Sequence, residues 1–141
     1  MSYRGIFHPS NPKKYVGNLK RIVYRSLWER KFMVYCDTSK SIAEWGSEEL
    51  AIPYISPLDK KMHRYYPDFY LKTIEGNKFI IEIKPKKYCK RPIVPKRKTH
   101  KYYKQVYGYI KNRAKWDSAT KFCSKTGMKF KILTEDTLGI Y

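Results

Sequence analysis

A helical repeat of apolar positions is the first strong pattern in the chain, over about 22–36. Within it, Trp28, Phe32 and Cys36 follow one another in steps of four, the spacing of one face of a helix. Neither glycine nor proline interrupts the run, and the polar residues 37–39 end it. The pattern predicts an amphipathic helix.

Short alternating segments come next and predict a β-sheet. The segment 42–45 is brief, and the segment 50–55 contains a proline, which favours an edge or bulged strand because proline cannot donate a ladder hydrogen bond. Two longer runs, 65–72 and 78–84, flank the turn-forming residues 75–77. We therefore expect a hairpin.

The last third of the chain predicts a loop, a long helix and a strand. Residues 86–98 are dense in lysine and arginine and are broken by two prolines, so they should form an exposed loop. Helical periodicity follows over about 99–126, with Gly127 where a helix C-terminal glycine belongs. Residues 128–133 indicate a final strand.

These elements predict an α/β fold. The length of 141 residues fits one domain. We assign residues 1–18, which are polar and contain glycine, proline and asparagine, to an irregular arm with no fold of its own. The remainder, 19–141, is expected to form a single domain.

The formal net charge of +19, from 31 basic and 12 acidic residues, indicates a polyanionic partner. Nucleic acid is the commoner choice and an anionic membrane the alternative; no apolar run approaches the ~20 residues that span a bilayer. The N-terminus lacks the apolar core of a signal peptide, so we expect a soluble protein of a reducing compartment. The three widely spaced cysteines then predict free thiols, and neither they nor the histidines show zinc-site spacing.

The predicted hairpin carries the candidate chemistry. Because side chains alternate along a strand, Asp68, Glu82 and Lys84 should project from one face while the apolar residues of both strands face the core. If the turn centres on Gly76, Asp68 lies roughly opposite Lys84 and Glu82 roughly opposite Tyr70. The three side chains would then be neighbours.

Converging carboxylates repel each other unless a cation lies between them, and their oxygens suit Mg²⁺ or Mn²⁺. The alternative is a solvated hairpin face on which Lys84 only forms salt bridges. Three features favour the metal interpretation: Pro67 directly before Asp68, the isoleucines on both sides of Glu82, and the high positive charge.

Two motifs resemble a known nuclease family. The sequence YYPDFY (65–70), followed by IIEIKP (80–85), resembles the Pro-Asp…Asp/Glu-x-Lys signature of restriction-like endonucleases, and in particular the TnsA-like branch. That branch has an acidic residue in a Ser-x-x-Glu context on a preceding helix, and Ser26 and Glu29 fit it. The resemblance implies a restriction-endonuclease-like core, a central mixed β-sheet flanked by α-helices.

The C-terminal half resembles the head completion proteins of T4-like phages, through Lys115-Trp116, Cys123 and the segment 129–135. This resemblance implies a role in phage head completion after DNA packaging, in the virion or in the cytoplasm of the infected host cell. Portal or neck proteins and a second copy of the chain are the protein partners that it leaves open.

The resulting hypothesis is a DNA endonuclease. Asp68 and Glu82 would ligate Mg²⁺ or Mn²⁺ together with the Ile83 carbonyl, Glu29 would hold a water or a second metal, and Lys84 would position the attacking water. A DNA-backbone clamp is expected from the basic loop and one helical lysine, namely Lys86, Lys87, Lys90, Arg91, Lys96, Arg97, Lys98 and Lys115.

Three further residues are expected to have no catalytic role. Glu48 and Glu49 are interpreted as solvated turn residues, and Trp116 as core packing. Two other functions remain open: a structural DNA-binding protein of the virion neck that does not cut, and a single-stranded nucleic-acid binder that uses some of the 14 tyrosines for stacking.

Overall fold

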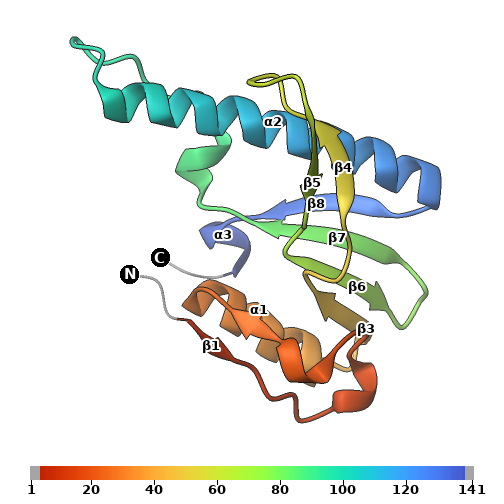
Figure 1. Cartoon of the computed structure of the whole chain (residues 1–141). Helices are drawn as coiled ribbons and strands as arrows, with labels where there is room; N and C mark the ends of the chain where they lie inside the picture. Colours follow the sequence, from red (N-terminus) through yellow and green to blue (C-terminus); the bar gives the residue numbers. More distant parts are fainter. Residues whose placement is uncertain (1–3, 139–141) are drawn as a thin grey trace.

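The computed structural model describes residues 4–138 and builds them around a four-stranded mixed sheet (Figure 1). The strand order is β3-β6-β7-β8. The strand β6 is antiparallel to both β3 and β7, and β8 runs parallel to β7. Their bounds are β3 Ile42–Ser47, β6 Phe69–Thr73, β7 Lys78–Ile83 and β8 Lys129–Leu133. The sheet confirms the predicted α/β class.

Helices cover both faces of this sheet, as Figure 1 shows with α1 below it and α2 above it. The helix α1 (Leu27–Thr38) packs Phe32, Met33 and Cys36 against apolar residues of β3, β6 and β7. On the other face, α2 (His100–Thr126) buries Trp116 and Ala119. Because both faces are covered, an acidic side chain on a central strand is enclosed rather than solvated.

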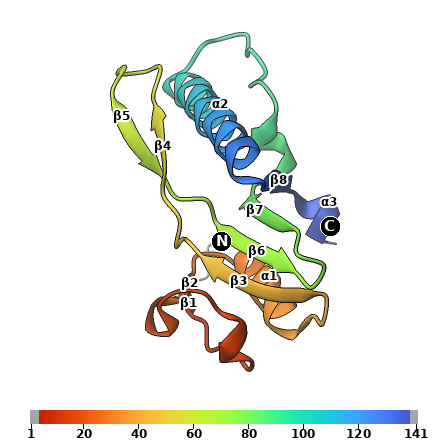
Figure 2. The same ribbon diagram turned by 90° about the vertical axis from the view of Figure 1, so that its right-hand side faces the viewer.

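A second, two-stranded sheet stands beside α2 and is seen extending away from the main sheet in Figure 2. It consists of β4 (Ile52–Ile55) and β5 (Met62–Tyr65), paired antiparallel. The prediction of one strand over 65–72 is therefore wrong: that segment breaks around Pro67, and β5 and β6 lie in different sheets. Proline cannot donate to a ladder, which explains the break.

The register of the β6–β7 hairpin differs by two residues from the expected one. Tyr70 pairs with Ile80 rather than with Glu82, so continuation of the ladder places Glu82, not Lys84, opposite Asp68. The turn is centred one residue earlier than predicted, with the Thr73 N–H donating to the Asn77 carbonyl at 2.9 Å. A two-residue shift leaves every side chain on its predicted face.

The N-terminal part of the described chain belongs to the core. It is largely irregular, as expected, with 3-10 turns at Pro12–Lys14 and Leu19–Arg21, but its short strand β1 (Gly5–Ile6) pairs with β2 (Val23–Tyr24). Phe7 and Tyr15 are buried in the same cluster as α1. The expectation of an arm without fold of its own is thus corrected for residues 4–18; residues 1–3 lie outside the described part.

The first helix begins later than predicted, at Leu27 instead of Ile22, and ends at Thr38. Ile22 is buried, but Val23 and Tyr24 pair as β2, and Ser26 takes the N-cap position. Tertiary strand pairing therefore overrides the local apolar periodicity at this end.

The C-terminal elements largely follow the prediction. Thr99 caps α2 through its side chain, and Gly127 ends it with a left-handed φ of 73°. The basic segment is an exposed loop with one 3-10 turn, Lys86–Cys89, and a short helix α3 (Glu135–Leu138), which was not predicted, follows β8. Cys36, Cys89 and Cys123 are free thiols, as expected. Among residues 4–138, no helix combines the length and apolarity needed to cross a membrane.

Candidate metal centre

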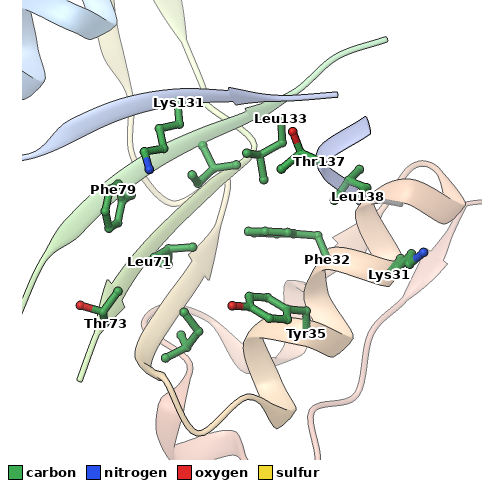
Figure 3. Close-up of a pocket in the computed structure, with 12 residues that line it drawn as sticks. Lys31, Phe32, Tyr35, Leu71, Thr73, Phe79, Lys131, Leu133, Thr137 and Leu138 are labelled. Atoms are coloured by element: carbon green, nitrogen blue, oxygen red, sulfur yellow. The ribbon is translucent and has the colours of Figure 1, made fainter. Parts of the chain in front are cut away.

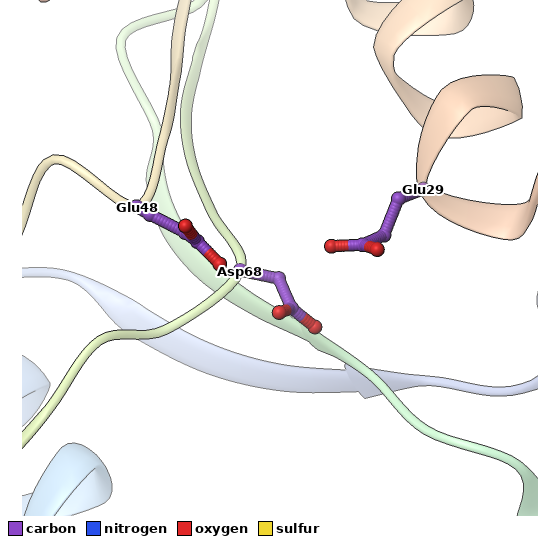
Figure 4. A group of neighbouring side chains, drawn as sticks. All are labelled: Glu29, Glu48 and Asp68. Carbon is purple, nitrogen blue, oxygen red and sulfur yellow. The ribbon is translucent and has the colours of Figure 1, made fainter. Parts of the chain in front are cut away.

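Three acidic side chains from separate parts of the chain meet at one end of the main sheet (Figure 4). Glu29, Glu48 and Asp68 each offer a carboxylate oxygen, and these oxygens lie within 4.8 Å of one another. Glu29 lies in the first turn of α1, Glu48 directly follows β3, and Asp68 directly precedes β6. Carboxylates this close repel each other, and a hard divalent cation satisfies them.

Glu29 is fixed by the start of α1. The Ser26 hydroxyl oxygen accepts a hydrogen bond from the Glu29 N–H at 3.2 Å, while Glu29 Oε2 accepts one from the Arg25 N–H at 2.9 Å. This resembles a capping box, so the Ser-x-x-Glu pattern has a structural use as well. Burial raises the pKa of Glu29, and the hydrogen bonds that its carboxylate accepts from the Arg25 N–H and from the Ser26 hydroxyl partly oppose that rise.

Glu48 is the member that sequence reasoning missed. It is a turn residue, as expected, with a left-handed φ of 54°, but its carboxylate joins the cluster instead of lying in solvent alone. Its N–H donates to the Asp68 carbonyl at 3.1 Å, and its side chain forms an ion pair with Arg25. The pairing of β3 with β6 brings it there, and no local pattern encodes that pairing.

Asp68 is tied to β7 through its side chain. Its Oδ2 accepts a hydrogen bond from the Ile83 N–H at 2.8 Å. In an extended strand the N–H and C=O of one residue point to the same side, so the Ile83 carbonyl is directed towards Asp68. Burial and, after it, the negative charge of Glu82 raise the pKa of the Asp68 carboxyl. The ionised form of Asp68 is therefore favoured only when a nearby cation compensates its negative charge.

Glu82 lies beside Asp68 but outside the group of three, on the side of the sheet that faces α2. It is 8% exposed, and its Oε2 accepts a hydrogen bond from the indole Nε1 of Trp116 at 3.3 Å. Trp116 is buried core, as predicted, but it also has this polar role. The structure thus brings the predicted carboxylates Glu29, Asp68 and Glu82 into one region and adds Glu48.

Two lysines supply positive charge next to the carboxylates. Lys84 and Lys115 are both half-buried, and Lys115 Nζ lies 5.6 Å from the ring centroid of Tyr65. Burial lowers the pKa of Lys115, as do the charges of Lys111 and Lys84, whereas Glu82 raises it. Lys115 therefore faces the same centre as Lys84.

The cationic residues of the basic loop are exposed, but one of its lysines already forms contacts within the chain. Lys86 donates from its backbone to Glu135 at 2.8 Å and from its side chain to Asp136 at 3.1 Å, both on α3. The other predicted phosphate contacts in the loop are exposed; these are Lys87, Lys90, Arg91, Lys96, Arg97 and Lys98.

A separate cavity of about 460 Å³ lies between α1 and the sheet, on the face away from α2 (Figure 3). Phe32, Leu71, Phe79 and Leu133 line it, and within the described part of the chain its lining contains no carboxylate. The cavity is a mainly apolar space between α1 and the sheet and is not part of the acidic centre.

Comparison with known proteins identifies the family of the chain. Residues 39–135 match the family model described as the TnsA-like endonuclease N-terminal domain. The chain is also 40% identical over 142 residues to the head completion nuclease of Enterobacteria phage T4, covering 98% of this chain and 95% of that protein. Both findings confirm the resemblance predicted from the sequence motifs.

Proposed function

Since this chain belongs to the TnsA-like endonuclease family, we propose that it hydrolyses DNA phosphodiester bonds with Mg²⁺ or Mn²⁺ held at the carboxylates around Asp68. Membership confirms the predicted nuclease activity and the restriction-endonuclease-like fold. The metal ion, the DNA substrate and the individual residue roles are the proposed part. The observation that carries it is the convergence of Glu29, Glu48 and Asp68, with Glu82 adjacent.

The oxygen donors fit a hard divalent cation. Asp68 and Glu82, with the Ile83 carbonyl, would hold it, and Glu29 and Glu48 would hold a water or a second ion. Such an ion, when bound, lowers the pKa of a coordinated water and stabilises charge on the phosphate. The chain's own contribution is to fix these carboxylates from α1, β3, β6 and β7 on a sheet that packing keeps rigid.

The two half-buried lysines would act on the attacking water and on the scissile phosphate. Lys84, two residues beyond Glu82 on the same face, would orient the attacking water, and Lys115 from α2 would neutralise charge on the scissile phosphate.

The basic loop supports DNA as the substrate. Its exposed cations would contact phosphates without reading bases, which gives affinity with a steep salt dependence. The T4 relative is named for head completion, and we infer the same setting for this chain: action on packaged DNA in the virion or the infected cell, next to portal or neck proteins. A homodimer would allow both strands of a duplex to be cut.

Cleavage of linear DNA with and without Mg²⁺ tests the proposal. Asp68→Asn and Lys84→Ala should each reduce cleavage by about 100-fold or more. Lys78→Ala, on the same strand but at its exposed far end, is the matched control and should cut like the parent chain. Parent protein that binds DNA without cutting it would favour the non-cleaving neck protein, and equal cleavage by Asp68→Asn would refute the assigned site.

A further inference from the structure

Glu82 is held across the domain by a residue from another element. Trp116 is 3% exposed in the middle of α2, and its indole N–H donates to Glu82 Oε2. The contact joins residues 34 positions apart and is buried at both ends. Glu82 therefore does not rotate freely, although it is a side chain with several torsions.

Packing alone does not require this contact. Trp45 is fully buried in the other core cluster, and its indole N–H has no hydrogen-bond partner among the described residues. The fold thus accommodates a core tryptophan without pairing its nitrogen. Burial of the Trp116 ring therefore does not by itself explain why its N–H donates to a carboxylate of the proposed site.

A second polar group points to the same place. Tyr65 is 3% exposed, and its hydroxyl has no hydrogen-bond partner within residues 4–138. The charges of Glu82 and Asp68 contribute to a raised pKa of Tyr65, after its burial, so the hydroxyl lies close to both carboxylates. Tyr65 is thus a second buried polar group beside the carboxylate that Trp116 contacts.

We propose that Trp116 is a positioning residue that holds Oε2 of Glu82 so that the other carboxylate oxygen is presented to a divalent cation shared with Asp68. The inference rests on the proposed metal role of Glu82. A hydrogen bond from outside the coordination shell orients a ligand and keeps it anionic, and loss of such a bond commonly weakens metal binding 10–100-fold. Trp116→Phe removes the N–H while retaining most of the buried ring.

Mn²⁺ binding to the DNA-free protein, measured by calorimetry at one fixed pH, tests this without relying on activity. We expect Trp116→Phe to bind Mn²⁺ about 10-fold more weakly than the parent. Phe122→Leu, which alters packing in the same cluster without a polar contact to Glu82, should change the affinity less than twofold. Thermal melting of each variant verifies that it is folded.

A double-mutant cycle separates positioning from packing. In a Glu82→Gln background, Trp116→Phe should cost less than twofold, because the carboxylate that it orients is gone. An equal loss in both backgrounds, or parent-like binding by the single variant, overturns the inference. If the parent chain itself binds no Mn²⁺, the proposed metal site fails, and the inference falls with it.

Nuclear magnetic resonance of the unmodified chain gives an independent readout should Trp116→Phe not fold. The assigned indole N–H resonance of Trp116 should shift when Mg²⁺ is added, while that of Trp45 should not. Both tryptophans are buried, so a general change in packing would move both. An unchanged Trp116 resonance at saturating Mg²⁺ overturns the inference.

Discussion

Neutralising Asp68 should stabilise the metal-free protein while it abolishes cleavage. Asp68 lies among carboxylates, and burial followed by the charge of Glu82 raises its pKa in the folded state. In the unfolded chain an aspartate titrates near pH ~3.9. Between the unfolded-state pKa and the higher folded-state pKa, the folded state binds more protons than the unfolded state. The free energy of unfolding therefore falls as the pH rises above about 4.

The size of the effect follows from this environment. Enclosing a carboxylate costs several kcal/mol, and the hydrogen bond from the Ile83 N–H offsets part of that cost. For Asp68→Asn, whose amide oxygen can keep that bond, we expect a gain on the order of 2 kcal/mol at pH 8. This corresponds to about 6 °C in Tm for a domain of this size.

Thermal unfolding in a chelating buffer at pH 4, 6 and 8 measures the gain. It should be near zero at pH 4 and grow with pH, and added Mg²⁺ should stabilise the parent but not Asp68→Asn. The control is Glu75→Gln, the same charge change at an exposed turn residue, which should have little effect at any pH. A lower Tm for Asp68→Asn at pH 8 would refute the argument that like charges and burial dominate at this position.

Three further predictions address the rest of the structure. Glu48→Gln should weaken Mn²⁺ binding measured by calorimetry, because its carboxylate belongs to the cluster, whereas Glu75→Gln should not; identical affinities would return Glu48 to the status of a turn residue. Replacing Lys96, Arg97 and Lys98 together by alanine should reduce the magnitude of the slope of log K for DNA binding against log salt concentration by about 3. Fluorescence anisotropy measures this slope, and an unchanged slope would show that the loop does not contact DNA. In urea unfolding, Gly127→Ala should cost about 1 kcal/mol because φ is +73°, while Gly108→Ala inside α2 should gain up to about 1 kcal/mol; a shared sign for the two would contradict the assigned conformations.

The sequence by itself determined the elements whose signals are local. The long helix α2 starts at a capping threonine and stops at a glycine, and both signals are readable because they involve neighbouring residues only. The faces of the hairpin were also determined, since side chains alternate with a period of two. That alternation is why Asp68 and Glu82 could be assigned to one face before any register was known.

The tertiary structure decided the contacts between distant segments. A two-residue shift of the β6–β7 register changes no face, so the apolar pattern could not distinguish Glu82 from Lys84 as the residue opposite Asp68. Glu48 enters the cluster because β3 pairs with β6, and Trp116 reaches Glu82 because α2 covers the sheet. Such contacts depend on how whole helices and strands pack together. The spacing of residues within a single helix or strand does not predict that packing.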